Sequence, residues 1–472
     1  MSFYWFDYET FGTHPAYDRP AQFAGVRTDD SLRPVGDPLL VYCKPANDFL
    51  PDPEACIITG ITPDICIDKG IPEAEFIRTI HDEMSKPGTC NVGYNNLRFD
   101  DEFTRHTLFR NFFDPYEQEW KNGNSRWDLL DIVRMTRALR PDGIEWPVHS
   151  DGSINNTLQA ITSLNGIEHT HAHDALSDVY ATIAVARLLR ERKKRLFDFA
   201  FENRDKHSAA ALLNLREQKM VLHVSGMIPG DYLHTALILP LTKHPSNKNG
   251  ILVYDLRVDP RPFLDLEPEE LALRQFSPKS ELPDDMPRLP VKTVHLNRCP
   301  VLAPAATLDK AAQQRTRISP EQSEKHAKIL RKHPAFAKNV QLASAEQSFQ
   351  DSPDVDGSLY SGGFFTESDK RAFEKIRNTL PDKLANLDLF YDDRRIPEML
   401  FRYRARNFPE TLDAGETAEW NMQRHKRLRD YRPTGYEAGD YLDKLRLLQE
   451  ALPQHSELLD RLRAYALDVL AP

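Results

Sequence analysis

The pattern of apolar and polar positions changes character along the chain. In roughly the first 200 residues, short apolar runs alternate with segments whose apolar residues recur every three or four positions, which predicts alternating strands and helices. This alternation is typical of an α/β domain. The predicted strands cover residues 3–6, 22–27, 39–43 and 89–94, and the predicted helices cover residues 73–84, 101–111, 129–139 and 174–195.

A different pattern begins near Lys219. Short β-like runs are separated there by glycine, proline and asparagine, as in a small antiparallel barrel or sandwich. Within this part, helices are expected at residues 267–275 and 320–332. Residues 351–363 form a predicted linker, and nearly all of the sequence beyond it has a helical pattern. The sequence therefore predicts three domains, over residues 1–198, 199–348 and 349–472.

Length and composition fit a multidomain globular protein. The 472 residues exceed one compact core, and 40% hydrophobic with 28% charged residues excludes a disordered chain. No apolar stretch approaches the roughly 18 residues of a membrane span, and no basic segment precedes the first apolar run, so export is not expected. The five cysteines lack a C-x-x-C pair, which favours reduced, mostly buried thiols of a cytoplasmic protein.

The net charge of −10 argues against indiscriminate attraction to a polyanion such as nucleic acid. It does not exclude a basic groove on an otherwise acidic surface. The arginine-rich runs within residues 394–406 and 424–429 are more typical of solvated helix faces than of DNA contacts.

The first candidate site is the segment WFDYETFG, in which Asp7 and Glu9 follow an apolar run. Residues two positions apart share a face of a strand, so both carboxylates point the same way. Two like charges held together are costly unless a cation lies between them, and a divalent metal ion is the commonest one. The spacing alone is weak evidence, because 71 acidic residues in 472 give about 11 acid-x-acid pairs by chance.

Two more acidic positions stand at element boundaries. Asp100 lies where a predicted helix leaves the C-terminal end of a predicted strand, which is a usual place for active-site residues and also for a helix-capping aspartate. His173 precedes the helix predicted at 174–195, and a lone histidine there is more often a cap or a solvated residue than a general base. Asp178, among apolar and small residues in the second predicted turn, is either exposed or buried for a function.

In combination, the ordered patterns D-x-E, N-x-x-F-D and H-x-x-x-x-D are identified as the motif set of the DEDD exonuclease superfamily, histidine subgroup. Seven segments also resemble the bacterial exodeoxyribonuclease I family, from residue 7 to about residue 413, so the resemblance covers nearly the whole chain. They read DYETFGTHPAYDRPAQFAGVRTD, ITGITP, GYNNLRFDDE, NSRWDLLD, NGIEHTHAHDALSDVYATIA, HVSGM and YRARNFPETLD.

The resemblance implies an α/β nuclease domain with a ribonuclease H-like mixed sheet and helices, followed by an SH3-like β-barrel domain and an all-α C-terminal domain. It implies a monomeric, processive enzyme of DNA repair and recombination. Such an enzyme degrades single-stranded DNA in the 3′→5′ direction to nucleoside 5′-monophosphates, along a positively lined channel.

The resemblance also assigns the catalytic roles. Four carboxylates offer hard oxygen ligands for two Mg²⁺ ions, with Mn²⁺ as a substitute. Two such ions stabilise the attacking and the departing oxygen of an in-line displacement. His173 is the implied general base toward water, since a histidine pKa of about 6.5 suits proton abstraction at neutral pH. The implied catalytic set is Asp7, Glu9, Asp100, His173 and Asp178.

Substrate contacts are expected directly after the first acidic pair and again beyond Asp100. Interleaved rings and arginines suit single-stranded DNA, because bases stack on rings and arginine meets phosphate. Some of these rings belong to the core instead, which we expect of Trp127. The expected contacts are Glu9, Thr10, Phe11, Arg105, Tyr116, Trp120, Arg134 and Thr157, the last standing where the family has an arginine.

The resemblance further implies docking on the acidic C-terminal tail of the single-stranded-DNA-binding protein. Arg140, Lys219 and Arg331 fall at the matching positions. Pro304 and Asp309 stand where the family commonly shows polar and basic residues, so the chain departs from the family pattern at this docking site.

Two alternatives stay open at the level of the sequence. The same chemistry acting on RNA would make the chain a 3′→5′ exoribonuclease. A nuclease-like single-strand-binding module without activity would not need the acidic residues, and all five residues of the catalytic set are present.

Overall fold

The computed structural model describes residues 1–169, 174–283, 286–345, 352, 354–429 and 438–471. Its contacts divide the chain into two compact units. The first consists of Met1–Arg126, His169–Tyr180 and Phe349–Pro472, and the second consists of Trp127–Glu168 and Ala181–Ser348.

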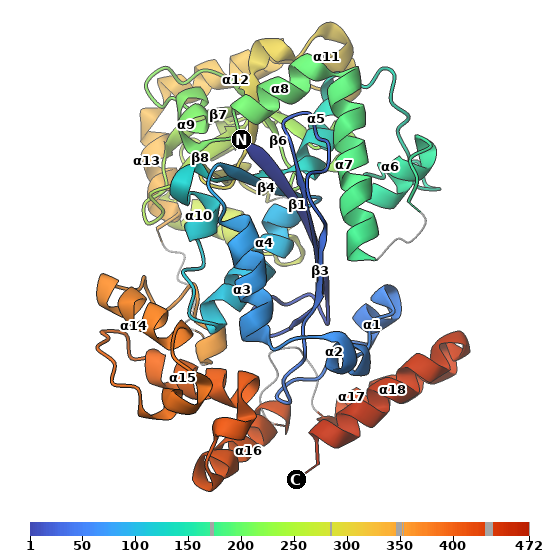
Figure 1. Cartoon of the computed structure of the whole chain (residues 1–472). Helices are drawn as coiled ribbons and strands as arrows, with labels where there is room; N and C mark the ends of the chain where they lie inside the picture. Colours follow the sequence, from blue (N-terminus) through green and yellow to red (C-terminus); the bar gives the residue numbers. More distant parts are fainter. Residues whose placement is uncertain (170–173, 284–285, 346–351, 353, 430–437, 472) are drawn as a thin grey trace. The chain divides into compact units, whose positions relative to one another are not determined.

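A five-stranded mixed sheet of order β3-β2-β1-β4-β5 carries the N-terminal part of the chain (Figure 1). Strand β1 (Ser2–Thr10) is central, since it pairs antiparallel with β2 (Pro20–Thr28) and parallel with β4 (Thr89–Gly93). The edge strands are β3 (Leu39–Tyr42) and β5 (Ser125–Asp128). The expected mixed α/β sheet is therefore confirmed.

Strand β1 is longer than the predicted residues 3–6. Phe6 and Tyr8 pack with Phe23 in one core cluster, and pairing with β2 continues to the end of the strand. Asp7 and Glu9, at the alternate positions, face the other way. The prediction ended too early because it followed the uninterrupted apolar run, whereas the strand continues by alternation.

The helices of the α/β part lie close to the predicted spans. Helices α3 (Glu73–Met84) and α5 (Leu129–Leu139) match them, and α4 (Asp100–Arg110) begins one residue early. The long helix expected at 174–195 is interrupted at Lys193, whose backbone is not helical. The segment forms α7 (Ala175–Arg192) and α8 (Lys194–Glu202). The prediction missed the break between them because the apolar face continues across it.

The described C-terminal residues of the first unit are helical, as predicted for an all-α C-terminal domain. Helix α18 (Ser456–Val469) packs against the short helices α1 (Pro53–Thr59) and α2 (Pro63–Lys69), as Figure 1 shows. With α17 (Ala438–Ala451) it contributes to a hydrophobic core that also contains Phe11. The remaining helices here are α14 (Glu367–Arg377), α15 (Ile396–Asn407) and α16 (Ala414–Arg429).

Two predictions about this C-terminal part are wrong. Among the described residues of the expected linker, Asp354 and Asp356 are buried, and a 3-10 turn spans Val355–Gly357. The arginine runs are solvated only in part. Arg394, Lys426 and Arg429 are exposed, as expected. Arg402 and Arg406 instead pair with these two aspartates. The charge pattern gave no sign of this, since the partners lie about 50 residues apart.

The second unit contains a five-stranded antiparallel sheet of order β10-β6-β7-β8-β9, as expected of the SH3-like part. Its strands are β6 (Val221–Val224), β7 (Thr235–Lys243), β8 (Gly250–Asp255), β9 (Val291–His295) and β10 (Val301–Pro304). Its other helices are α6 (Leu158–Leu164), α9 (Lys206–Leu212), α10 (Pro268–Phe276), α11 (Lys310–Thr316), α12 (Pro320–Lys332) and α13 (Pro334–Ala343).

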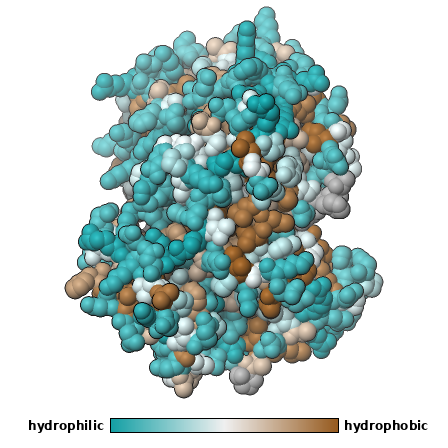
Figure 2. All heavy atoms as spheres, in the orientation of Figure 1, coloured by the Kyte–Doolittle hydropathy of each residue, from teal (hydrophilic) through white to brown (hydrophobic). Residues whose placement is uncertain are grey.

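Hydrophilic side chains cover most of the face drawn in Figure 2, with apolar side chains in smaller groups between them. Across the described part of the chain, no helix combines the length and the apolar composition that crossing a membrane demands.

Candidate active site

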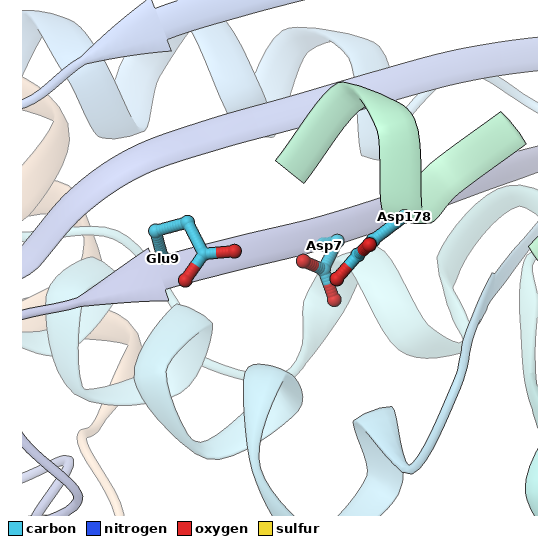
Figure 3. A group of neighbouring side chains, drawn as sticks. All are labelled: Asp7, Glu9 and Asp178. Atoms are coloured by element: carbon cyan, nitrogen blue, oxygen red, sulfur yellow. The ribbon is translucent and has the colours of Figure 1, made fainter. Parts of the chain in front are cut away.

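Three carboxylates meet beside the central strand. Asp7 and Glu9 belong to β1, and Asp178 reaches Asp7 from the first turn of α7 (Figure 3). Carboxylate oxygens of the three residues all lie within 4.8 Å of one another. The fold thus brings the D-x-E pair and the helix-borne aspartate together, although they are far apart in the sequence.

The fourth predicted carboxylate is held against the same strand. Asp100 is the first residue of α4 and is buried, and its Oδ1 accepts a hydrogen bond from the backbone N–H of Tyr8 at 3.1 Å. Strand β4 pairs with β1 only as far as Trp5, so the Tyr8 amide lies beyond that ladder. Asp100 therefore takes the place of a strand partner, while the N-cap position of α4 belongs to Phe99.

The electrostatics of this cluster favour a bound cation. Burial, then the charges of Asp100 and its neighbours, raise the pKa of Asp7 well above its usual value. Burial, then the charge of Asp178, raise the pKa of Glu9 to about 9. A cation among these groups would offset both effects, and carboxylate oxygens are the ligands that Mg²⁺ and Mn²⁺ prefer. The donor set therefore fits a divalent metal ion.

A histidine also contacts this cluster. Nε2 of His169 lies 2.5 Å from Oδ1 of Asp178, and the His169 side chain is 4% exposed. The sequence prediction names His173, which lies outside the described residues, so its role stays a prediction. His169 belongs to the same HTHAHD string, but only the folded distance to Asp178 distinguishes it from its neighbours.

Family models match three successive segments of the chain. A model for Exonuclease matches residues 4–186, the Exonuclease I SH3-like domain matches residues 204–345, and the Exonuclease I C-terminal domain matches residues 353–469. Exodeoxyribonuclease I of Escherichia coli K12 is 45% identical over 464 residues, which are 98% of this chain and 96% of that protein. The chain belongs to the exodeoxyribonuclease I family.

Other members of the exodeoxyribonuclease I family agree with this assignment. The Haemophilus influenzae protein is 42% identical over 97% of this chain and 99% of its own length. Exonuclease I from Methylocaldum szegediense has a TM-score of 0.95 at 49% identity, with 100% of both chains covered. E. coli exonuclease I in complex with a dA16 oligonucleotide has a TM-score of 0.95 at 44% identity, with 99% of both chains covered.

These comparisons confirm the expected fold class and the expected enzyme class, a hydrolytic exonuclease. Exonucleases of the exodeoxyribonuclease I family require a divalent metal ion, and one solved structure is the zinc-bound form of the E. coli enzyme with single-stranded DNA. The donor set described above fits that requirement.

Thr10 and Phe11, predicted to hold the terminal nucleotide in the exodeoxyribonuclease I site, are turned into the protein. Thr10 is buried and donates its hydroxyl to the Gly12 carbonyl at 2.6 Å. Phe11 is 1% exposed, packs against Phe49, and donates its backbone N–H to the Arg19 carbonyl at 2.9 Å. The Phe11 ring is core, and its amide is already used within the protein.

Arg105 is also committed within the protein. Its buried guanidinium donates to Glu119 and to Glu102, each at 2.7 Å, so these donors are not open to a phosphate. Neighbouring Arg126 donates to Asp101 at 2.6 Å in the same way. The sequence could have indicated this pairing, because an acidic residue three positions before Arg105 lies on the same face of a helix.

An exposed aromatic surface lies near Arg105. Trp120 is 63% exposed, and Tyr116 is half-buried with the Arg105 guanidinium 5.5 Å from its ring centroid. Phe364, which sequence reasoning missed, is 88% exposed and its ring centroid lies 6.5 Å from that of Tyr116. Trp120 follows Tyr116 by four residues, and we call Tyr116, Trp120 and Phe364 together the ring surface. Trp127 is buried, as expected.

The two remaining predicted substrate contacts lie in the second unit. Arg134 donates to Asp131 at 2.5 Å. Thr157 is exposed at the N-cap of α6, where its side chain accepts from the Ala160 amide. Capping a helix is sufficient reason for a threonine at this position.

Each cation predicted to dock the acidic tail has a carboxylate neighbour in this chain. Oxygens of Asp309, Glu217 and Glu324 lie 3.1, 2.7 and 3.0 Å from nitrogens of Arg140, Lys219 and Arg331 respectively. Pro304, the other departure from the family, ends β10.

Proposed function

We propose that this chain shortens single-stranded DNA from its 3′ end by metal-dependent hydrolysis, releasing nucleoside 5′-monophosphates. The observation that carries the proposal is the meeting of Asp7, Glu9 and Asp178, with Asp100 anchored on the same strand. E. coli exonuclease I has been solved with bound DNA oligonucleotides, and the chain matches that protein over nearly its full length.

The metal ions are two Mg²⁺, with Mn²⁺ able to substitute, and Asp7, Glu9, Asp100 and Asp178 hold them. When bound, these ions supply Lewis-acid stabilisation of the attacking and departing oxygens. Four carboxylates against two divalent cations give a site near neutral charge. The raised pKa values of Asp7 and Glu9, caused first by burial and then by neighbouring carboxylates, support this assignment, because a bound cation would offset both effects.

In the hydrolysis, His173 accepts a proton from the attacking water. The water oxygen forms a bond to the phosphorus of the terminal nucleotide, and the bond from that phosphorus to the 3′ oxygen of the preceding nucleotide breaks. That 3′ oxygen takes up a proton as it departs. His173 suits this role because a histidine of ordinary pKa is neutral in part of the molecules at physiological pH.

The strand is held mainly by base stacking on the ring surface. Tyr116, Trp120 and Phe364 present rings at the surface of the first unit, and stacking tolerates any base. Glu9 stays a contact to the terminal nucleotide, and Arg134 and Thr157 stay further predicted contacts. The buried side chains of Phe11 and Arg105 act by shaping these surroundings rather than by touching DNA.

The wider assignments follow the family. The chain acts as a processive monomer in DNA repair and recombination, in the cytoplasm, where its five free cysteines stay reduced. Its domains span residues 1–198, 199–348 and 349–472. It docks on the acidic C-terminal tail of a single-stranded-DNA-binding protein through Arg140, Lys219 and Arg331. One solved structure that resembles this chain is an ExoI/SSB-Ct complex.

The test is hydrolysis with Mg²⁺ of single-stranded DNA, duplex DNA and RNA, each labelled at the 5′ end. We expect stepwise shortening and mononucleotide release from single-stranded DNA only, at least a thousandfold less in Asp7→Ala, and unchanged rates in the exposed-residue control Asp68→Asn. Faster release from RNA would replace the substrate assignment by an exoribonuclease. Binding of DNA without release from any substrate would leave an inactive binding module.

A further inference from the structure

The contact between His169 and Asp178 gives the site a residue beyond the predicted catalytic set. Nε2 of His169 lies 2.5 Å from Oδ1 of Asp178, and the two side chains are 4% and 18% exposed. At this distance an imidazole N–H donates a hydrogen bond to the carboxylate.

Two of the four carboxylates are thereby anchored. The backbone N–H of Tyr8 holds one oxygen of Asp100, and the imidazole of His169 holds one oxygen of Asp178. A carboxylate turns easily about its last torsion, and repulsion from Asp7 and Glu9 would turn Asp178 away from them. A donor that holds one oxygen keeps the Asp178 carboxylate close to the other two.

We infer that His169 is a positioning residue, whose N–H fixes the Asp178 carboxylate so that it can join Asp7 and Glu9 in holding a divalent cation. Its side chain is buried and its Nε2 contacts Asp178, so we assign its role through that carboxylate. Partners that orient a metal-binding carboxylate contribute about 10–100-fold to metal affinity. This inference rests on the proposed function, because it presupposes a metal site at these carboxylates.

The experiment measures Mn²⁺ binding to the DNA-free full chain by calorimetry and by electron paramagnetic resonance. His169→Leu removes the donor, and His169→Gln keeps an N–H near the position of Nε2. His207→Leu, at an exposed position at the start of α9, is the matched control. We expect Mn²⁺ affinity to fall about 10–100-fold in His169→Leu, to recover most of that loss in His169→Gln, and to stay unchanged in His207→Leu.

Hydrolysis kinetics give a second readout. Because the inferred role of His169 runs through Asp178, His169→Leu should lower kcat at fixed Mn²⁺ while KM for single-stranded DNA stays the same. Raised Mn²⁺ should restore part of kcat. Circular dichroism in EDTA checks that each variant is folded. If His169→Leu does not fold, His169→Asn replaces it, since its amide is too short to reach Asp178.

Two results would overturn the inference, namely wild-type Mn²⁺ affinity in a folded variant without the donor, or equal losses in His169→Leu and His169→Gln. Failure of the proposed function looks different. In that case wild type and Asp7→Ala would bind Mn²⁺ equally, and substitutions at position 169 would make no difference.

Discussion

Asp7 and Glu9 are the residues on which the site depends, and ionising either of them lowers the stability of the metal-free protein. Their side chains share a face of β1, lie near Asp178, and hold protons well above the pH at which a free carboxylic acid loses them. The period of two in a strand made this pair predictable from the sequence. The packing of Thr10 and Phe11 was not predictable, because a register shift follows Glu9.

The raised pKa of Glu9, about 9, predicts how metal-free stability depends on pH. The folded state keeps a proton that the unfolded state loses above about pH 4.5, so stability is full below that pH and falls as the pH rises toward 9. Glu9→Gln cannot ionise and should be more stable than wild type by on the order of 3 kcal/mol at pH 8, and equal at pH 4. Urea unfolding in EDTA at both pH values measures this, and parallel curves for the two proteins would contradict it.

A single carboxylate, Asp309, competes with an acidic peptide for Arg140. Its Oδ2 lies 3.1 Å from Nη1 of Arg140, and its side chain also accepts from the Ala312 amide at the start of α11. Asp309→Asn keeps a capping side chain and removes the competing charge. An acidic peptide should then bind about two- to fivefold tighter at low salt.

Fluorescence anisotropy of a labelled acidic peptide measures this affinity. Glu321→Gln, an exposed acid on α12, is the control for net charge. Equal gains in both variants would mean that only the overall charge matters, and no gain in either would remove Arg140 from the docking surface.

At the scale of elements, the site depends on where β4 stops. The strand ends at Gly93, a 3-10 turn follows at Asn96–Arg98, and α4 begins at Asp100. The early end of β4 leaves the Tyr8 amide for Asp100. A Cβ at Gly93 would lie 2.7 Å from Cβ of Asn96 and 3.0 Å from the backbone oxygen of Phe6. The turn that delivers Asp100 therefore has no room for a side chain at this glycine.

Gly93→Ala should displace this turn, destabilise the protein by about 1–3 kcal/mol, and weaken Mn²⁺ binding as Asp100 moves. Chemical denaturation and calorimetry report the two effects. Gly439→Ala is the control, since nothing lies within 4 Å of a Cβ there, and it should be neutral or slightly stabilising. Wild-type behaviour of Gly93→Ala would show that the turn can shift without moving Asp100.

Sequence patterns predicted most elements but not what they contact. The spans of α3, α5 and α12 were correct because their apolar residues recur at helical spacing. The break at Lys193 leaves that spacing intact, so it was missed. Asp100 was found from its place at a strand-to-helix junction, whereas its bond to Tyr8 depends on how far two strands pair.

For the molecule as a whole, buried charges join distant parts of the first unit. Asp356 lies within 3.6 Å of guanidinium nitrogens of Arg19, Arg402, Arg406 and Arg427. Against the effect of burial, Arg406, Arg402 and Arg427 hold the pKa of Asp356 well below its usual range. The sequence suggested a linker and solvated helices here because a charge run does not disclose a partner that is distant in the chain.

Asp356→Asn should leave several arginines partly unpaired in the interior and destabilise the protein by about 3–5 kcal/mol at pH 7. The contribution of Asp356 is present above the unfolded carboxyl pKa of about 3.9 and is lost as the pH falls below it, so the difference between the proteins should shrink there. Urea unfolding at pH 7 and pH 3 measures this, with the exposed-residue variant Asp382→Asn as control. A loss that is the same at both pH values would contradict the ionic origin.

The core around Phe11 has a consequence for how the protein is made. This residue lies two positions after Glu9, and it shares its core with Leu462 and Val469 of α18. A ribosome releases residues 1–11 long before residues 456–469, so the end of β1 waits for its packing until that helix has emerged. Incomplete chains left by interrupted translation therefore lack the part of the core that covers the end of β1, next to the metal-binding strand positions.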